Sequence, residues 1–387
     1  MVKAIKVMLI PNNVQKTKMF QYAGASRFAY NWALAREIEN YEKGGKFISD
    51  AELRKEFTKL RHSDEYAWLL NISNNVTKQA IKDACTAYKN FFKGLQKFPR
   101  FKSRKRSMPK FYQDNVKIQF SNTHVKLEGF SSSRKANKQK MNWVRLAEHG
   151  RIPTDVKYMN PRISFDGLNW WISVCVEFPD CRETLNDDGV GVDLGIKDLA
   201  ICSDGTKYKN INKSQKVKKL EKQKRRLQRS ISRSYEKNKK GESYCKTNNV
   251  IKKEKLLLKR NHRLTNIRKN YLNQTISEIV NRKPRFICIE DLNVSGMMKN
   301  RHLSKAVQEQ GFFWFRKQLE YKCSDKGIQL IVADRFYPSS KLCSCCGNIK
   351  KDLKLSDRVY RCECGNMIDR DFQASINLKT YGEKFAS

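Results

Sequence analysis

Residues 286–292, Phe-Ile-Cys-Ile-Glu-Asp-Leu, form an apolar run that ends abruptly in two carboxylates. Four consecutive apolar residues rich in β-branched types are typical of a strand that is buried on both faces. An unpaired carboxylate is costly to bury, so a strand that ends in one must direct it at water, a cation or a metal. The sequence therefore predicts a buried strand that delivers Glu290 to a polar site.

Two distant stretches place acids in comparable positions. Residues 191–196, Gly-Val-Asp-Leu-Gly-Ile, carry Asp193 in a short apolar strand flanked by glycines. Residues 369–376, Asp-Arg-Asp-Phe-Gln-Ala-Ser-Ile, place two acids at the start of an expected helix. Acids on two strands and at one helix start can converge, so we expect these three segments to build one site.

Asp193, Glu290 and Asp371 are the predicted ligands of Mg²⁺ or Mn²⁺ at that site, since both ions prefer carboxylate oxygens. Two such ions about 3.5–4 Å apart can activate a water and stabilise the leaving oxygen in phosphodiester hydrolysis. Taken singly, each acid has another explanation. Asp193 could lie in a turn, and Asp369 or Asp371 could be a helix N-cap.

Twelve cysteines are present, and five of them lie between residues 343 and 364. Residues 343–347, Cys-Ser-Cys-Cys-Gly, and 362–365, Cys-Glu-Cys-Gly, are close pairs, each followed by a glycine that permits a turn. Such thiolate pairs predict a structural Zn²⁺ site in a reducing cytosol, whereas the alternatives are a redox pair or an incidental cluster. The expected ligands, with Cys345 spare, are Cys343, Cys346, Cys362 and Cys364.

The charge of the chain points to a polyanionic partner. Its 387 residues contain 79 Lys and Arg against 39 Asp and Glu, a formal net charge of +40. Nucleic acid is the expected polyanion and a membrane surface is the rival. No apolar run approaches 18 residues, which predicts that no helix spans a membrane and that the protein is cytoplasmic.

Residues 97–112 interleave basic residues with phenylalanines, a composition suited to phosphates and unpaired bases. The alternative is a linker whose Phe98 and Phe101 enter a core. A second basic region, residues 213–240, has 13 basic residues against two acids. An amide can pair bidentately with adenine, which makes Gln79 the best single candidate for reading a base. The predicted nucleic-acid-binding residues are Lys78, Gln79, Arg100, Phe101, Lys102, Arg104, Lys105, Arg225 and Arg226.

Periodicity predicts a strand-rich N-terminal half interrupted by helices. Several short strands without intervening helices favour a barrel or a sandwich, which the first strand joins, so that the helices are an insertion. The expected strands are 3–10, 116–120, 125–127 and a hairpin over 161–178, and the expected helices are 17–41, 49–60 and 75–95.

The acidic stretch 180–188 is the expected domain boundary. Beyond it, periodicity predicts a long basic helical hairpin, two further helices and buried strands. The expected elements are helices over 213–240, 250–280 and 303–325, strands at 191–196, 286–290 and 329–333, and a last helix from Asp371.

The blocks around Asp193, Glu290 and Asp371, together with Ser-Ser-Lys-Leu-Cys-Ser-Cys-Cys-Gly at residues 339–347, resemble the TnpB family. These transposon-encoded RNA-guided nucleases are related to type V CRISPR effectors. The three blocks resemble the split RuvC motifs of that family in their order, and the zinc-ribbon entry lies between the last two. Two positions depart from the pattern: Gln373 stands where the family often has Asn, and the second cysteine pair is one residue short.

The resemblance implies a multidomain α+β protein. A wedge-like β-barrel would carry an inserted helical recognition module, and an RNase H-like (RuvC) α/β nuclease domain would carry an inserted zinc ribbon. The implied domains are the barrel at 1–12 and 97–184, the helical module at 13–96, the nuclease at 185–336 and 366–387, and the ribbon at 337–365.

The same resemblance implies a function. We expect an RNA-guided DNA endonuclease with Asp193, Glu290 and Asp371 as its catalytic acids. A guide RNA from the transposon end would direct it to double-stranded DNA beside a short adjacent motif, as a monomeric ribonucleoprotein. The absence of a recognisable major-groove reader agrees with sequence choice by a bound RNA, because backbone contacts carry no sequence information directly.

Three other functions compete with this expectation. A transposase would join DNA ends with a similar acidic site. An RNA-guided DNA-binding repressor would have lost an acid, whereas all three are present here. A zinc-ribbon RNA-binding protein without chemistry would leave the acid-tipped strands unexplained.

Overall fold

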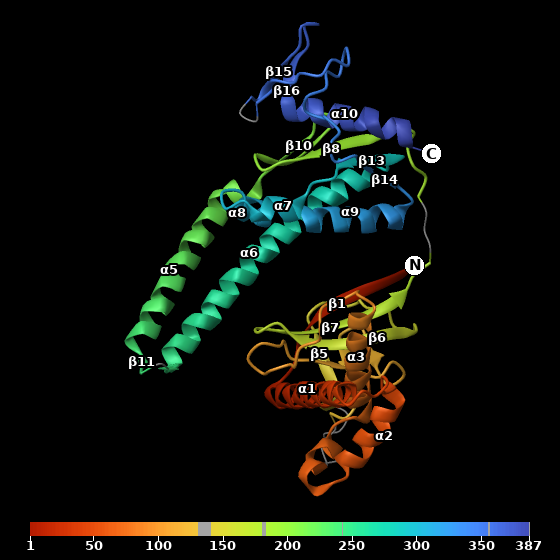
Figure 1. Cartoon of the computed structure of the whole chain (residues 1–387), viewed down its shortest axis with the longest axis vertical. Helices are drawn as coiled ribbons and strands as arrows, with labels where there is room; N and C mark the ends of the chain where they lie inside the picture. The colour runs from red at the N-terminus through yellow and green to blue at the C-terminus, as the bar shows by residue number, and fades with distance from the viewer. Residues whose placement is uncertain (131–140, 180–182, 242, 355–356, 387) are drawn as a thin grey trace. The chain divides into compact units, whose positions relative to one another are not determined.

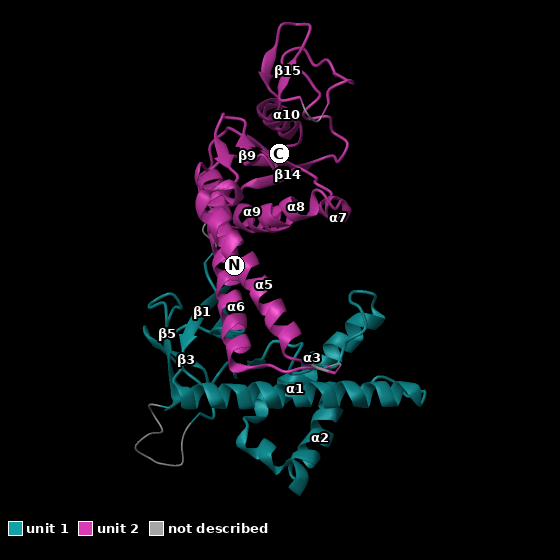
Figure 2. Cartoon of the chain, turned by 90° about the vertical axis from the view of Figure 1, so that its left-hand side faces the viewer, with its two compact units in different colours: residues 1–179 teal, residues 180–387 magenta. Residues whose placement is uncertain are grey.

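A computed structural model describes residues 1–130, 141–179, 183–241, 243–354 and 357–386 (Figure 1). The chain divides into two compact units, residues 1–179 and residues 180–387 (Figure 2). This division falls at the edge of the boundary predicted at 180–188, of which residues 180–182 lie outside the described residues. Each unit contains a sheet and a hydrophobic core of its own.

The first unit is built on a seven-stranded antiparallel sheet with the order β2-β6-β7-β1-β5-β4-β3. Alternate residues of β7 are buried, as the polar–apolar alternation of its sequence requires. Pairing of the end strands β2 and β3 would close the predicted barrel, and no such pairing occurs among the described residues. The strands are β1 (Val2–Ile10), β2 (Lys110–Tyr112), β3 (Gln119–Phe120), β4 (His124–Lys126), β5 (Trp143–Leu146), β6 (Tyr158–Phe165) and β7 (Trp170–Glu177).

Helices α1 (Asn13–Glu42), α2 (Asp50–Arg61) and α3 (Asn74–Phe92), with the short helix η1 (Asp64–Asn71), lie between β1 and β2 in the chain. Side-chain capping boxes start α1 and α2, which satisfies backbone N–H groups that a helix start leaves unpaired. Tyr22 of α1 packs edge-on against Phe111 of β2 and against Phe130. The three helices therefore share one core with the sheet rather than forming a bundle of their own.

Two expected elements differ in the structure. Val116 is not in the strand predicted from 116 to 120: it is 87% exposed, and its N–H donates to Asp114 Oδ1 in a turn. The single helix predicted over 303–325 is two helices, α8 (Ser304–Gln310) and α9 (Phe312–Lys326). Gly311 separates them because it adopts a left-handed conformation (φ 71°), which an α-helix cannot continue through.

The second unit is built on a five-stranded sheet with the order β10-β9-β8-β13-β14. β8 and β14 run parallel to β13, whereas β9 is antiparallel to β8 and to β10. One face of the sheet is covered by α10 (Arg370–Phe385) and the other by α6 and α9 (Figure 1). The strands are β8 (Val190–Leu194), β9 (Asp198–Cys202), β10 (Lys207–Lys209), β13 (Phe286–Glu290) and β14 (Gln329–Ala333).

Helices α5 (Gln215–Lys237) and α6 (Asn248–Asn281) form the predicted long hairpin, with the short strands β11 (Lys239–Lys240) and β12 (Ser243–Tyr244) at its tip. A small apolar cluster of Val217, Leu220 and Leu264 joins the two helices. The short helices η3 (Ile211–Lys213) and α7 (Val294–Lys299) complete the helices of this unit among the described residues. In the part of the chain that the structure describes, no helix is both long and apolar enough to cross a membrane.

Between β14 and α10 the chain forms a small cysteine-rich segment, residues 337–369, which includes the zinc ribbon predicted at 337–365. Its ordered core is the antiparallel pair of β15 (Val359–Arg361) and β16 (Met367–Asp369), together with a bridge between Leu342 and Ile349. The backbone turns that carry the cysteines lie between these pairings. β16 leads directly into α10, so the segment is continuous with the helix that covers the sheet.

Candidate active site and metal centre

Strand pairing places Asp193 and Glu290 at the same edge of the sheet. β8 and β13 are parallel neighbours in which Val192 pairs with Ile289, so the next residue of each strand is an acid. Val192 and Ile289 pack into the core on the α6 and α9 side. Because side chains alternate along a strand, both acids lie on the α10 face, where the carboxyl ends of parallel strands form ligand sites.

Helix α10 reaches this face because two glycines allow a close approach. A Cβ on Gly191 of β8 would overlap the backbone carbonyl oxygen of Ser375, and a Cβ on Gly382 of α10 would overlap the ring of Phe286. The helix therefore lies directly on β8 and β13, with its first turn at their carboxyl ends. This packing carries Asp371 toward the two strand acids.

The two acids at the start of α10 have different tasks. Asp369 is the N-cap: its Oδ1 accepts from the N–H groups of Asp371 and Phe372, each at 3.1 Å. Asp371 lies in the first turn, where its Oδ1 accepts from Arg370 Nη2 at 3.0 Å. The N-cap explanation considered for either acid is thus correct for Asp369. The Asp371 carboxylate caps no helix and lies between Arg370 and Arg358, whose Nη1 is 3.9 Å from Oδ2.

The charges of the three carboxylates act on one another. Burial, and then the charges of Glu290 and Asp371, raise the pKa of Asp193 well above its ordinary value. Burial and the charge of Asp371 also raise the pKa of Glu290, against a hydrogen bond from Ser339. Carboxylates that repel one another favour either protonation or a nearby cation. Among the described residues, only the cysteine cluster brings three or more ligand atoms within 4.8 Å of one another, so a metal at the acids belongs to the proposed function.

Asp291 immediately follows Glu290 but does not belong to the cluster. Its Oδ1 accepts from Arg316 Nη1 at 2.8 Å and its Oδ2 accepts from Arg335. These two hydrogen bonds lower the pKa of Asp291. Of the two carboxylates that end β13, only Glu290 is directed at the other acids.

Ser339 holds the Glu290 carboxylate in place, a contact that the sequence analysis did not anticipate. The buried Ser339 donates its hydroxyl hydrogen to Glu290 Oε1, and Asn377 Nδ2 of α10 donates to the Ser339 carbonyl at 2.7 Å. Ser339 stands in the Ser-Ser-Lys stretch before the first cysteine pair, but no pattern in the sequence indicated that its hydroxyl would contact β13. The segment before the cysteines thus connects β13 to α10.

The four predicted zinc ligands form one cluster. Four sulfur atoms lie within 4.8 Å of one another, those of Cys343, Cys346, Cys362 and Cys364. The exposed Cys345 is outside this group. Gly347 and Gly365 follow the two turns with φ of 75° and 89°, conformations that require glycine. Four cysteine sulfurs at this spacing can surround one tetrahedral Zn²⁺.

Local donors favour the thiolate form of Cys343. Burial raises the pKa of this thiol, but the backbone N–H groups of Cys346 and Cys345 and the amide of Asn366 outweigh it and hold the pKa at about 6. Metals bind the thiolate, so such a pKa favours metal binding near neutral pH. Although a backbone hydrogen bond acts to lower each pKa, the neighbouring thiols raise the pKa of Cys346, and they raise the pKa of Cys364 to about 12, so a metal would have to displace protons from these two thiols.

A glutamine joins the cysteine cluster to the helix that carries Asp371. Gln373 is fully buried, its Nε2 donates to the Leu342 carbonyl at 2.8 Å, and its Oε1 accepts from Asn366 Nδ2 at 2.9 Å. Asn366 also contacts the Cys343 sulfur at 3.5 Å. The Gln373 side chain, where the resemblance led us to expect Asn, bridges α10 and both cysteine turns.

Known proteins resemble this chain along nearly its whole length. Family models match residues 1–46 (a helix-turn-helix domain), 173–301 (a probable transposase) and 312–378 (a Cas12f1-like TNB domain). The chain is 31% identical over 380 residues to the putative RNA-guided DNA endonuclease InsQ of Escherichia coli K12, covering 93% of this chain and 87% of the relative. The chain belongs to the TnpB family.

A second relative agrees with membership of the TnpB family, and a solved structure shares the fold. A putative RNA-guided DNA endonuclease of Streptomyces pristinaespiralis is 29% identical over 382 residues, covering 98% of this chain and 89% of the relative. A Cas12f1–sgRNA–target DNA complex contains a chain of similar fold, with a TM-score of 0.61, 12% identity and 98% coverage of both chains. The mixed α/β multidomain fold is thus shared between this TnpB chain and a Cas12 effector.

The predicted nucleic-acid-binding residues of this TnpB chain lie mostly on exposed surface. Two of them are held by other side chains of the first unit. Gln79 Nε2 donates to Asp83 Oδ1 at 2.9 Å, and Asp83 also pairs with Arg162. The exposed residues are Lys78, Arg100, Phe101, Arg104 and Lys105 in the first unit and Arg225 and Arg226 on α5.

Lys102 is the second of these held residues. Its backbone exchanges two hydrogen bonds of 2.8 Å with the Asn31 side chain, and its Nζ lies 2.9 Å from the ring centroid of Tyr30. Burial, and then the charge of Lys110, lower the pKa of Lys102 to about 7. The Lys102 ammonium is directed at the protein, so its contact with nucleic acid stays a prediction.

Proposed function

We propose that this chain is an RNA-guided DNA endonuclease encoded by an insertion sequence. It would cleave double-stranded DNA next to a short adjacent motif by metal-dependent phosphodiester hydrolysis. The convergence of Asp193, Glu290 and Asp371 from three distant segments carries the proposal. The names of the relatives that cover most of the chain, and its net charge of +40, support it.

The second unit supports an RNase H-like nuclease domain. Its sheet has three antiparallel strands, β10, β9 and β8, followed by β13 and β14, which run parallel to β8. Asp193 is the penultimate residue of β8 and Glu290 is the last residue of β13. We assign this domain to residues 185–336 and 366–387, with a zinc ribbon at 337–365. For the first unit we propose the wedge-like barrel at 1–12 and 97–184 and the helical module at 13–96, which pack against each other in one shared core.

Asp193, Glu290 and Asp371 would hold Mg²⁺ or Mn²⁺, which when bound supplies Lewis acidity toward water and the phosphodiester. Asp193 and Glu290 present their oxygens from rigid strand ends, and Asp371 closes the site from the first turn of α10. Ser339 fixes the rotamer of Glu290 by donating to Oε1. Cys343, Cys346, Cys362 and Cys364 would hold a structural Zn²⁺ that keeps the ribbon folded beside α10.

The decisive experiment reconstitutes the purified chain with RNA transcribed from the transposon end and with a plasmid that carries a matched target. Because base pairing would supply the sequence choice, replacing the guide portion of the RNA should move the cut to the new match. Cutting that stays at the old site, or that proceeds equally without RNA, contradicts the proposal.

A second candidate function is a transposase, which the matched family model of residues 173–301 names directly. The same carboxylates could serve strand transfer, because both reactions displace an oxygen at a phosphodiester. The two functions differ in their products. A transposase joins a DNA 3′ end to a new strand, whereas the endonuclease leaves free ends, and sequencing of the product junctions separates them.

A further inference from the structure

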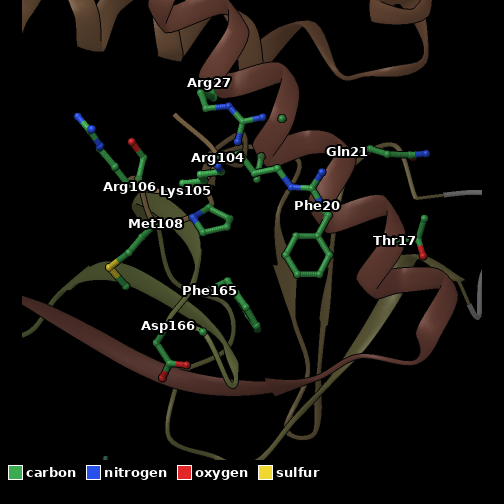
Figure 3. Close-up of a pocket in the computed structure, with 15 residues that line it drawn as sticks. Thr17, Phe20, Gln21, Arg27, Arg104, Lys105, Arg106, Met108, Phe165 and Asp166 are labelled. Atoms are coloured by element: carbon green, nitrogen blue, oxygen red, sulfur yellow. The ribbon is translucent and has the colours of Figure 1, made fainter. Parts of the chain in front are cut away.

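A groove runs along α1 in the first unit. Two cavities of about 760 and 970 Å³ lie along this helix, and both are lined by Gln21, Gly24 and Arg27. Figure 3 shows the first of them, where Phe20 and Arg27 extend from the helix near Arg104 and Lys105. Because the cavities share one stretch of helix, we treat them together as the α1 groove.

The groove is positively charged. Five basic side chains line it: Lys18, Arg27, Arg104, Lys105 and Arg106. Asp166 is the one acid among its lining residues. The Asp166 carboxylate is used inside the β6–β7 turn, where it accepts from the backbone of Leu168 and Asn169 and from Trp171 Nε1. The groove therefore offers cations to an anionic ligand without a matching local acid.

Aromatic side chains flank the same groove. Phe20 is 45% exposed although its ring makes edge contacts with Phe165 and Trp170. Trp68 is 46% exposed, and its ring makes an edge contact with Phe28. Partly exposed rings that are fixed at one edge by their neighbours can stack on unpaired bases. Such stacking does not depend on the nucleotide sequence, because every base has a flat aromatic face.

Gly24 has no role inside the fold that requires a glycine. It lies in the interior of a 30-residue helix, where a glycine makes the helix less stable than an alanine would. A Cβ at this position would meet no atom within 4 Å. Gly191 and Gly382 differ, because a Cβ on either would overlap neighbouring atoms. The missing side chain at Gly24 leaves room where the two cavities meet.

We propose that the α1 groove binds an unpaired segment of the guide RNA whose sugar–phosphate backbone crosses α1 at Gly24. Arg27 and Arg104 contact its phosphates, and Phe20 and Trp68 stack on its bases. This assignment rests on the proposed function. A guide is single-stranded before its target arrives, so its bases are free to stack, whereas the bases of duplex DNA are already stacked and paired.

The test compares Gly24→Ala and Gly24→Leu with wild-type chain in binding to transposon-end RNA, without DNA. Ser26→Ala is the matched control, because it also places alanine in α1 but at a residue that lines neither cavity. We expect Gly24→Ala to bind the RNA roughly tenfold more weakly, and Gly24→Leu more weakly still. The added side chain would hold the sugar–phosphate backbone of the RNA away from α1. All three variants should melt at or above the wild-type temperature, because each replacement favours the helix.

Arg27→Gln and Arg104→Gln provide an independent measurement. Each should reduce the slope of log affinity against log salt by about 0.7, the value for one phosphate contact on a single strand. Unchanged slopes, or Gly24→Ala that binds RNA as wild-type does, overturn the groove. Variants that bind RNA normally, but bind or cut target DNA less well, would show that the groove binds the target strand. That result would overturn the assignment of the groove to the guide RNA.

The outcome for the groove is distinguishable from the outcome for the proposed function. A wild-type chain that binds no transposon-end RNA contradicts both. A wild-type chain that binds RNA and cuts the matched plasmid, with a Gly24→Leu variant that does both equally well, contradicts the groove alone. A Gly24→Ala variant that melts below wild type would show that the glycine serves the fold, which also overturns the proposal.

Discussion

The carboxylate cluster and the cysteine cluster both suit a cation, but they are assembled by different means. Asp193, Glu290 and Asp371 lie on two strands and a helix that a hydrophobic core holds together. The cysteines lie on two turns of a small segment with little apolar core of its own. The hydrophobic core would therefore hold the first site in place without a metal, whereas the second would depend on a bound metal to hold its two turns together.

Replacement of a cluster acid should have the largest effect. Asp193→Asn, Glu290→Gln and Asp371→Asn should each lower cleavage by at least about a hundredfold, because each replaces a charged carboxylate that would bind the metal with a neutral amide. Nucleic-acid affinity, which comes mostly from Lys and Arg, should change little. Single-turnover cleavage of a matched plasmid and filter binding measure the two effects.

Two neighbouring acids are the controls for this prediction. Asp291→Asn should retain cleavage within a few-fold, since Asp291 pairs with Arg316 and Arg335 instead of the cluster. Asp369→Asn should also retain it, because asparagine caps a helix as well as aspartate does. Loss of cleavage in Asp369→Asn with none in Asp371→Asn would exchange their roles.

Removal of a cysteine ligand should have the next largest effect. The purified chain should contain about one Zn²⁺, and Cys362→Ser should lose it while Cys345→Ser keeps it, as Cys345 lies outside the cluster. Metal analysis of protein prepared without added zinc checks this. Because the ribbon would depend on zinc and the sheet would not, limited proteolysis of Cys362→Ser should cut first within residues 337–365.

Gly191→Ala tests how far the carboxylate site depends on packing. The added Cβ would overlap the Ser375 carbonyl, so α10 must shift, at a cost of about 1–3 kcal/mol. Both the melting temperature and cleavage should fall. Zinc content should stay near one, and a Gly191→Ala chain as stable as wild type would show that α10 is not held against β8.

Ser339→Ala should have the smallest effect, a shift in pH dependence. The pKa values of Asp193 and Glu290 are raised by burial and mutual repulsion, so cleavage should fall as pH decreases and protons replace the metal. The Ser339 hydrogen bond opposes this rise at Glu290. Its loss raises the pKa of Glu290 further, which moves the acid limb of the pH–rate profile to higher pH.

A higher metal concentration should move that acid limb back to lower pH, because metal and protons compete for the same oxygens. Ser340→Ala is the matched control, since the hydrogen bond to Glu290 comes from Ser339. An acid limb that Ser339→Ala leaves in place, or moves to lower pH, would show that the hydroxyl does not act on Glu290.

The sequence predicted those parts of the site that depend on a pattern within one short segment. The apolar run before Glu290, the strand around Asp193 and the close cysteine pairs were sufficient to nominate the residues that the structure brings together. The contacts between segments were not predictable. Ser339 and Gln373 act through hydrogen bonds to residues far away in the chain, and no period or spacing encodes such a partner.

Two further differences have local physical causes that the pattern could not decide. The apolar Val116 suggested a strand, but Asp114 accepts from its N–H and forms a turn. The periodic run over 303–325 indicated one helix, and the left-handed Gly311 divides it. A glycine inside a helical pattern is compatible with either outcome, because its own conformation is free.

The packing of α10 against β8 has a consequence for protein synthesis. Asp193 leaves the ribosome before Asp371, which follows about 180 residues later, or roughly 10–35 s at bacterial elongation rates. Until α10 emerges, Gly191 has no helix to contact and the site lacks one acid. Under the proposed function, a nascent or stalled chain would be unable to cut DNA, and the host would be exposed to the nuclease only once translation had passed α10.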